Sequence, residues 1–332
     1  MSLVYAYAEF DLCGPLPCGV TVLEASAGTG KTYTIAALAA RYVAEGTPLD
    51  RLLLITFTRI ATGELRDRVR ERLVVCEQQL SSILGGAGDP GTDPVITLLA
   101  TGPDKEVRSR RDRLARAVAD FDAATIATTH GFCQEVLAEL GTIGDLDRET
   151  EFVEDVSELL EETLDDLYVR RFGPRGGGTA RFTRAEALQI ARAAVGNPMS
   201  DLEPRDEPHD STAAMRYRLA VRVREELEQR KRRLAIMTYD DLLTRLRDIL
   251  RGPNAEAAKE RLRTRYDVVL VDEFQDTDPI QWQILSRAFV AEGVTLVLVA
   301  DPKQAIYAFR GADVRALTEF PYRFRSADGA EA

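Results

Sequence analysis

The sequence predicts an α/β fold in which helices cover both faces of a parallel sheet. Five short runs are apolar, rich in β-branched residues and followed by a polar or glycine-bearing loop. Near-continuous apolar character is typical of strands that are buried on both faces, as they are in parallel sheets. We therefore expect five strands, which lie within residues 19–26, 51–58, 123–130, 266–274 and 295–302.

Helical spacing begins soon after the second of these runs. Apolar residues recur there at steps of three or four, at Leu65, Val69, Leu73, Cys76 and Leu80. This spacing puts them in one stripe along a helix, and arginines occupy the remaining face. The pattern predicts a long helix that packs along one side and presents charge on the other.

Loop signals and a long helical stretch predict how the chain is divided. Glycine and proline punctuate residues 85–94 and 172–183, and residues 133–237 show helix-length patterns with no convincing strand. We expect an α/β domain made of residues 1–132 and 238–332, split by a mainly helical insertion at 133–237. Residues 66–120 form a further helical and loop insertion in this interpretation.

Length and composition exclude several classes of protein. The 332 residues, 45% of them hydrophobic, are enough for about two domains with a full core. Because no apolar run approaches about 18 residues and the first residues are acidic, we expect no membrane span or signal peptide, and a cytoplasmic protein. Four cysteines without a CxxC pair and two histidines indicate reduced, packed thiols rather than a zinc site.

Charge gives a weaker indication about partners. The net charge of −11 argues against wholesale wrapping of nucleic acid, although residues 66–73, 108–117 and 216–235 are locally basic. Each basic run is equally compatible with a solvated helix face whose charge is balanced by nearby acids. Composition alone therefore predicts no binding surface.

The segment "ASAGTGKT" has the layout of a loop that binds nucleotide phosphates. It follows the first predicted strand and opens a helix, so its backbone N–H groups can surround a phosphate. Lys31 would contact the β- and γ-phosphates and Thr32 would bind Mg²⁺. Ala25, small enough for close approach, stands where the first glycine of the pattern usually falls. The predicted cradle consists of Ala25, Ser26, Ala27, Gly28, Thr29, Gly30, Lys31 and Thr32.

Two further segments place polar side chains after predicted strands. In "VVLVDEFQDTDP", Asp272 could hold Mg²⁺ and Glu273 could activate a water, at the sheet edge where open α/β sheets bind ligands. An Asp-Glu pair alone could equally cap a helix, but the phosphate loop favours the catalytic interpretation. In "ADPKQAIYAFRGAD", Gln304 could sense a γ-phosphate.

The same last segment carries two aromatic residues. Tyr307 and Phe309 could stack on bases, and Arg310 beside them could contact a phosphate. The alternative is that both rings belong to the core. The neighbouring Gln304 favours the nucleic-acid interpretation.

These segments together carry a family resemblance. With "TFTRIATGELRDRV", "ATIATTHGFCQEVL" and "TYDDLL", they occur in the order of motifs I to III of superfamily 1 DNA helicases of the UvrD/Rep type. The sequences of these motifs are most similar to those of the beta subunits of exodeoxyribonuclease V. The resemblance implies a P-loop NTPase with a RecA-like domain, 1A, and a helical 1B arm. It also implies ATP and Mg²⁺ as cofactors and ATP-driven movement in the 3′ to 5′ direction along single-stranded DNA. The implied partners are a second RecA-like domain and RecC- and RecD-like subunits.

The resemblance assigns roles to individual residues. Lys31, Glu273 and Gln304 match catalytic positions, and Thr32 and Asp272 match metal-binding positions. The positions that line the single-stranded DNA path match Thr56, Phe57, Thr58, His130, Tyr239, Tyr307, Phe309 and Arg310.

Two functional hypotheses of different classes remain open on the sequence. Motifs IV to VI, which carry arginines for the γ-phosphate, and the nuclease domain do not follow the third motif, so we expect an incomplete motor that is weakly active alone. Loss of an arginine finger costs about 10³ to 10⁵ in rate. The alternative is a free-standing module that binds ATP and single-stranded DNA with negligible turnover. A P-loop kinase is disfavoured by "DEFQDTDP".

Overall fold

The fold divides into two compact units in the computed structural model. One unit comprises Met1–Asp145 with Leu243–Ala332, and the other comprises Leu146–Leu242. We call them the first and second units and describe each by itself. The structure describes residues 8–25, 30–89, 91–141, 150–153, 155–174, 176, 178–196, 202–208, 211–304 and 323–326.

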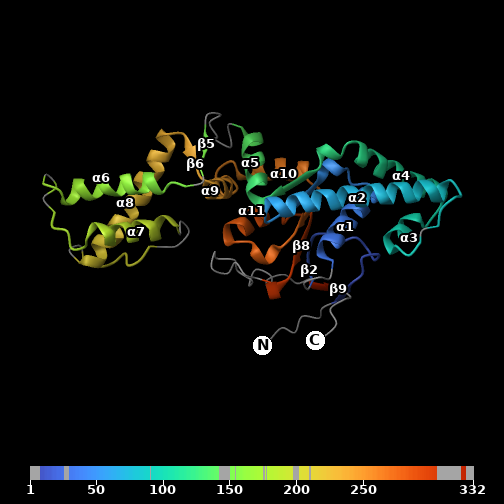
Figure 1. The fold of residues 1–332 in the computed structure, drawn as a ribbon, viewed down its shortest axis with the longest axis horizontal. Coiled ribbons are helices and arrows are strands. Elements are labelled where there is room, and N and C mark those ends of the chain that lie inside the picture. The colour runs from blue at the N-terminus through green and yellow to red at the C-terminus, as the bar shows by residue number, and fades with distance from the viewer. Residues whose placement is uncertain are drawn as a thin grey trace. The chain divides into compact units, whose positions relative to one another are not determined.

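A parallel sheet forms the centre of the first unit (Figure 1). Within the described residues it has seven strands in the order β1-β9-β2-β8-β7-β3-β4, and every neighbouring pair runs parallel. The strands are β1 (Ala8–Phe10), β2 (Val20–Glu24), β3 (Leu52–Thr56), β4 (Thr125–Thr128), β7 (Val268–Val271), β8 (Thr295–Ala300) and β9 (Arg323–Ser326).

The five predicted strands are confirmed as β2, β3, β4, β7 and β8, and every residue of β3 and β7 is buried. In β3, Leu52 and Leu54 belong to the core under α1, whereas Leu53 and Ile55 alternate to the opposite face and are equally buried. The sequence did not predict β1 and β9. They have three and four residues and carry polar side chains, so they lack the apolar run on which the prediction relied.

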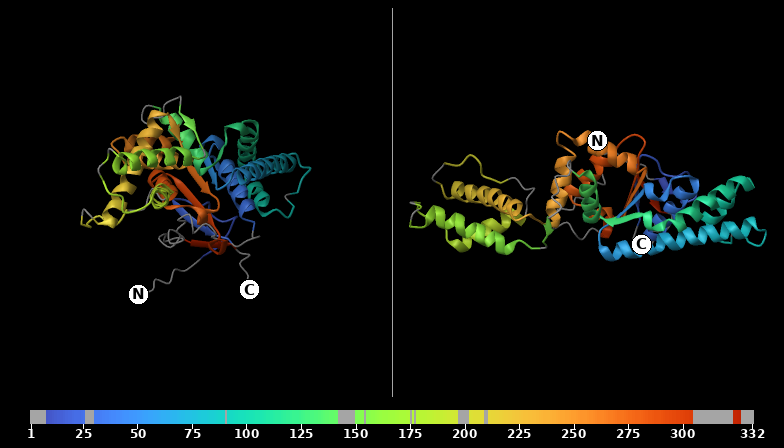
Figure 2. Two further views of the ribbon diagram at one scale, coloured as in Figure 1. Left: turned by 60° about the vertical axis from the view of Figure 1, so that its left-hand side comes forward. Right: turned by 90° about the horizontal axis from the view of Figure 1, so that it is seen from above.

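Helices cover both faces of this sheet. The helices of this unit are α1 (Lys31–Glu45), α2 (Arg59–Leu84), α3 (Pro94–Ala100), α4 (Asp104–Ala119), α5 (Thr129–Leu140), α10 (Ala255–Arg265), α11 (Pro279–Phe289) and the part of α9 (Tyr239–Ile249) from Leu243 onward. The long predicted helix is α2, and its five predicted apolar residues are all buried. Figure 1 shows α2 beside α4 and α1, and Figure 2 shows the same pairing from above.

Local sequence explains where the helices begin. The side chains of Thr58, Asp93, Thr128 and Asp278 accept backbone N–H bonds at the N-termini of α2, α3, α5 and α11, respectively. Helix α1 is rich in alanine and buried throughout residues 35–44, so it packs closely between the sheet and its neighbouring helices. On the opposite face, the rings of Phe132, Tyr266 and Phe289 pack together, and their centroids are 6.0 to 6.3 Å apart.

The second unit is mainly helical. Its helices α6 (Ser157–Phe172), α7 (Arg184–Gly196) and α8 (Thr212–Arg233) pack around a small core that includes Leu164, Phe182 and Val223 (Figure 2). The interval read as free of strands contains β5 (Glu151–Phe152) and β6 (Ile236–Met237), which pair in parallel. Two residues are too few to give a periodic signal, which is why the sequence did not show them. Among the described helices, none has the length and apolar character needed to cross a lipid bilayer.

Candidate nucleotide-binding site

The strand order brings the predicted site residues to one edge of the sheet. Strands β2, β8, β7, β3 and β4 are consecutive neighbours and all point the same way, so their carboxyl ends meet at that edge. The loops that follow β2, β8 and β7 carry the predicted nucleotide residues. The loop that follows β3 and the first turn of α5, which follows β4 directly, carry predicted DNA residues.

The two ends of the predicted phosphate loop are fixed by regular structure. At its start, the N–H of Ala25 donates to the carbonyl of Ala300 at the end of β8, with an N···O distance of 2.9 Å. At its end, Gly30 has φ 83°, a conformation that favours glycine, and α1 begins at Lys31. Thr32 lies half-buried in the first helical turn. Ser26, Ala27, Gly28 and Thr29 lie outside the described residues.

The end of β7 positions both predicted carboxylates. The N–H of Asp272 donates to the carbonyl of Ile55 in β3, at 2.8 Å, which continues the ladder one residue beyond the end of β7. Glu273 then adopts φ 50°, a left-handed conformation that is uncommon outside glycine, and its N–H donates to Oδ1 of Asp272 at 2.9 Å. This turn separates the two side chains and directs Glu273 toward α1. Its Oε2 lies 2.7 Å from Nζ of Lys31.

Electrostatics around this ion pair suit a cation. Burial, together with the charge of Glu273, raises the pKa of Asp272 to about 6. Burial, together with the charge of Glu273, also raises the pKa of Asp276 to about 6. Carboxylates that are crowded and partly withdrawn from water favour protonation or a bound cation. Asp272 and the hydroxyl of Thr32 provide the oxygen ligands that Mg²⁺ prefers, so the residues present fit that metal.

A buried glutamine that the sequence analysis missed connects two parts of the site. Nε2 of Gln275 donates to Oε2 of Glu273, and Oε1 of Gln275 accepts the N–H of Asp301 at 2.8 Å. Oδ2 of Asp301 in turn accepts Nε2 of Gln304 at 2.7 Å. The sequence signal that could have identified Gln275 is that it is a neutral amide among the acids of "DEFQDTDP". The importance of Gln275 depends on its burial, which the sequence does not show.

The structure brings together some of the predicted DNA residues. Thr56 pairs with Thr128 across β3 and β4, so Phe57 and His130 follow neighbouring strands at the same edge. Oγ1 of Thr58 caps α2 by accepting the N–H of Ala61 at 3.1 Å. Oγ1 of Thr56 lies 2.7 Å from the hydroxyl of Thr62, which ties the end of β3 to α2.

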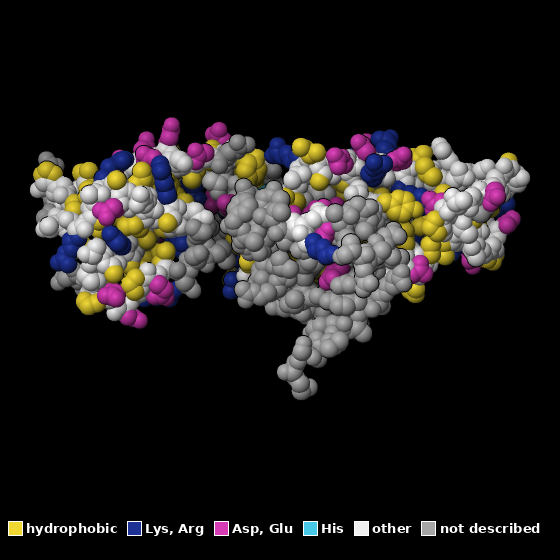
Figure 3. Space-filling model, turned by 60° about the horizontal axis from the view of Figure 1, so that its bottom comes forward, with side chains coloured by type: hydrophobic (Ala, Val, Ile, Leu, Met, Phe, Trp, Pro, Cys, Tyr) yellow, Lys and Arg dark blue, Asp and Glu magenta, His cyan; other side chains and the backbone are white. Residues whose placement is uncertain are grey.

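The remaining predicted DNA residues belong to the second unit or lie outside the described residues. Tyr239 lies in the second unit, where its ring stacks on Phe152 with a centroid distance of 6.4 Å and an interplanar angle of 22°. Tyr307, Phe309 and Arg310 lie outside the described residues. On the face drawn in Figure 3, acidic and basic side chains are interspersed rather than gathered by sign.

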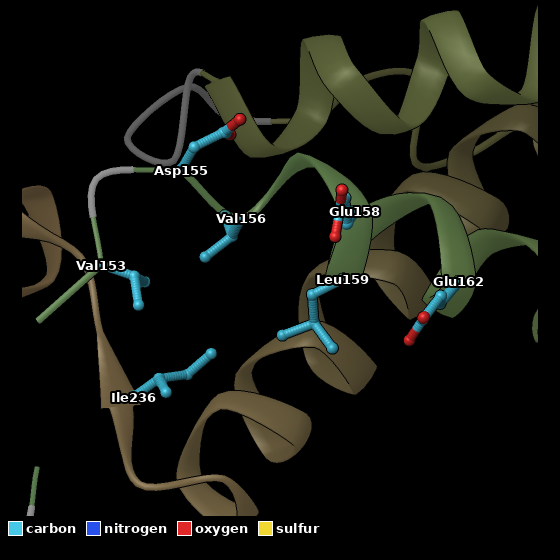
Figure 4. A pocket seen from close by; sticks show the side chains of 7 residues that line it. All are labelled: Val153, Asp155, Val156, Glu158, Leu159, Glu162 and Ile236. Carbon is cyan, nitrogen blue, oxygen red and sulfur yellow. The ribbon is translucent and has the colours of Figure 1, made fainter. Parts of the chain in front are cut away.

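A pocket in the second unit does not match nucleotide chemistry. Its volume is about 430 Å³, and Figure 4 shows apolar side chains such as Leu159 and Ile236 together with the carboxylates Asp155, Glu158 and Glu162. Among the described residues that line it, none carries a positive charge that could hold a triphosphate. The edge of the sheet in the first unit remains the candidate nucleotide site.

Comparison with known proteins gives one family and several relatives. Residues 14–325 match the model of the UvrD/REP helicase N-terminal domain. The chain is 50% identical to the RecBCD enzyme subunit RecB of Mycolicibacterium smegmatis, over 92% of this chain and 27% of the relative. It is 48% identical to the subunit of the same name from Mycobacterium tuberculosis H37Rv, over 92% and 28%. It is 27% identical to the RecBCD enzyme subunit RecB of Escherichia coli K12, over 89% of this chain and 35% of the relative. The chain thus spans roughly a quarter to a third of these relatives' length.

Proposed function

Since the chain belongs to the UvrD/REP helicase N-terminal domain family, we propose that it is the ATP-binding motor portion of a RecB-like DNA helicase. In this proposal ATP drives movement along single-stranded DNA in the 3′ to 5′ direction, during the repair and recombination of double-strand breaks. A second RecA-like domain completes the motor, and RecC- and RecD-like subunits are its partners. The relatives extend well beyond the matched segment, so the activity of the whole protein is part of the proposal.

One observation supports the proposal most directly. Lys31 at the start of α1 and Glu273 after β7 form an ion pair at the carboxyl edge of the sheet, although 242 positions separate them in the sequence. A cation at a helix N-terminus and a carboxylate beside a second carboxylate are the groups that hydrolysis of a bound nucleoside triphosphate requires.

Each residue has a defined task in this proposal. Lys31 holds the β- and γ-phosphates, and Thr32 and Asp272 hold Mg²⁺. The metal, when bound, neutralises charge on the phosphates. Glu273 orients a water and accepts its proton, and Gln304 contacts the γ-phosphate. The described first unit would be the RecA-like domain 1A, and the second unit would be the 1B arm.

ATP turnover by two forms of the protein tests the proposal. We expect the 332 residues alone to hydrolyse Mg·ATP slowly, because in this proposal the second RecA-like domain supplies the arginine finger for the γ-phosphate. The same residues joined to a second RecA-like domain should turn over about 10³-fold faster or more, with stimulation by single-stranded DNA. If binding is present but the joined protein stays equally slow, the alternative, a module that only binds ATP and DNA, is correct.

Substitution of the proposed catalytic carboxylate supplies the control. Glu273→Gln should abolish turnover in the joined protein and leave Mg·ATP binding in place. Glu292→Gln, at an exposed loop position of the same unit, should have no effect on either quantity. Rapid hydrolysis that is insensitive to Glu273→Gln would contradict the proposed site.

A further inference from the structure

We propose that Gln275 is a positioning residue that couples Glu273 to Gln304. The inference rests on the proposed function and deepens it, because Glu273 is the proposed base and Gln304 the proposed γ-phosphate contact. No role for Gln275 follows from the motif assignments above. It follows from the hydrogen bonds that this side chain makes.

Both ends of the Gln275 amide are used. The side chain is buried, with 2% of the residue exposed, in the short turn Phe274–Asp276 that follows β7. Its Nε2 donates to Oε2 of Glu273, and its Oε1 accepts the N–H of Asp301 at 2.8 Å. Because a buried amide that loses a partner is costly, the two contacts hold each other in place. Gln275 thereby connects the loop after β7 with the loop after β8.

Asp301 continues the connection to Gln304. It is also 2% exposed, and its Oδ1 accepts the N–H of Lys303 at 3.0 Å. Its Oδ2 accepts Nε2 of Gln304 at 2.7 Å, and the N–H of Gln304 donates to its carbonyl at 3.0 Å. Asp301 therefore links Gln304, through its carboxylate, to Gln275, through its backbone N–H.

The contact with Lys31 shows why Gln275 matters when nucleotide binds. Lys31 and Gln275 both donate to the same oxygen of Glu273, Oε2. A triphosphate attracts the Lys31 ammonium more strongly than one carboxylate does, since it carries more negative charge. Gln275 is then the donor, among the described side chains, that still fixes Oε2. A purely structural amide would instead only satisfy buried polar groups.

The preference of the 332-residue chain for an ATP analogue over ADP distinguishes a positioning role of Gln275 from a purely structural one. Calorimetry would measure the affinities for Mg·ADP and for a non-hydrolysable Mg·ATP analogue in the parent and in Gln275→Met. If Gln275 positions the γ-phosphate contact, the preference for the ATP analogue over ADP falls at least about threefold, the scale of one hydrogen bond, while ADP affinity stays within about twofold. Gln281→Met removes an amide at an equally buried position in α11, with 5% exposed, and should leave the preference unchanged.

A second variant and a combined one complete the test. Gln275→Asn keeps a neutral amide but is one carbon shorter, so it cannot reach both Glu273 and Asp301 and gives the same readout if the methionine variant does not fold. In a Gln304→Ala background, Gln275→Met should produce no further loss of preference, because both act through one connection.

The outcomes separate this inference from the proposed function. An unchanged preference in the folded Gln275 variants, within a parent that prefers the ATP analogue, overturns the inference and leaves the proposed function standing. Equal binding of both nucleotides by the parent also overturns the inference. A parent that binds neither nucleotide overturns both.

Discussion

Nζ of Lys31 lies 2.7 Å from Oε2 of Glu273, and the two side chains are only 10% and 31% exposed. The pair joins the first residue of α1 to the loop after β7 within the first unit. The contact orients the two side chains toward each other. A bound triphosphate would therefore meet a cation already placed at the helix N-terminus, with a carboxylate beside it.

Replacing this lysine should abolish nucleotide binding. Lys31→Ala removes the ammonium that contacts the β- and γ-phosphates, so we expect no measurable Mg·ATP binding by calorimetry. The circular dichroism spectrum should stay that of the parent, since the residue opens α1 rather than packing in the core. Lys105→Ala, at an exposed position in α4, is the matched control and should bind normally. Unchanged Mg·ATP affinity in the Lys31 variant would contradict the assignment of Lys31 to phosphate binding.

Substitution of Asp272 should weaken metal binding and raise the stability of the fold. Asp272→Asn removes one proposed Mg²⁺ ligand charge, so the Mg²⁺ concentration needed for ATP binding should rise about tenfold or more. Because burial and Glu273 raise the pKa of Asp272 to about 6, its ionised form costs folding free energy. That cost is absent below pH of about 4, develops as the pH rises toward 6, and is complete above it.

The asparagine variant should accordingly be more stable than the parent at pH 7.5 without Mg²⁺, by about 1 to 3 kcal/mol. Denaturant unfolding measures this directly, and a magnesium titration of nucleotide binding measures the loss. Asp50→Asn, at an exposed position, should change neither. Destabilisation together with an unchanged magnesium requirement would show that Asp272 is a structural residue.

Much of the fold could be predicted because burial leaves a simple mark on the sequence. Strands such as β7 are apolar on both faces, and residues such as Leu65 and Val69 recur at the helical period. The short strands β5 and β6 leave no such mark, since two residues give no period. Their pairing depends on residues that are 85 positions apart, Glu151 with Ile236 and Phe152 with Met237, and only the folded chain shows it.

The site was predictable in its residue types but not in its connections. Lys31, Asp272 and Glu273 stand out because they follow strands and open a helix. The left-handed conformation of Glu273 and the buried bridge through Gln275 depend on tertiary contacts. Tyr239 shows the converse, since its place in a motif gave no indication that its ring stacks on Phe152.

A second ion pair should contribute to stability without affecting the nucleotide. Arg72 in α2 is buried, and its Nη2 donates to Oδ1 of Asp93 at 2.9 Å while Nη1 contacts Oδ2. The same carboxylate caps α3. Arg72→Met leaves this half-buried acid without its partner, so we expect a loss of about 2 to 4 kcal/mol in denaturant unfolding at pH 7. Arg68→Met, whose ion pair with Glu71 is exposed, should cost less than about 1 kcal/mol.

The pH dependence of this pair has the opposite sign to that of Asp272. The hydrogen bond from Arg72 holds the pKa of Asp93 below its ordinary value. Its contribution to stability is therefore fully present above about pH 4 and is lost as the pH falls through the lowered pKa. The difference in unfolding free energy between parent and Arg72→Met should shrink between pH 5 and pH 2. A constant difference over that range would mean that packing of the arginine, rather than its charge, is what stabilises α3.

DNA binding should depend on stacking more than on long-range attraction. The net charge of −11 opposes association with a polyanion, so affinity would have to come from aromatic side chains and a few phosphate contacts. Phe57, which follows β3, and the sequence-predicted Tyr307 and Phe309 are the candidate rings. Single strands, whose bases are free to stack, should be preferred over duplex. The slope of log affinity against log salt should be shallow, at roughly 0.7 for each phosphate contacted.

Removing the rings tests this expectation most directly. Phe57→Ala should cost about 1 to 3 kcal/mol of binding to a single-stranded oligonucleotide, and joint substitution of Tyr307 and Phe309 by alanine about 2 to 6 kcal/mol. Fluorescence anisotropy across a salt titration measures both. Phe57→Tyr keeps a ring at the same position and should bind as the parent does. Because stacking does not release counterions, the alanine variants should lose affinity without a change in salt slope. Parent-like binding by the double variant would place Tyr307 and Phe309 in the core, and a changed slope with Phe57→Ala would mean that this loop acts on phosphates instead of bases.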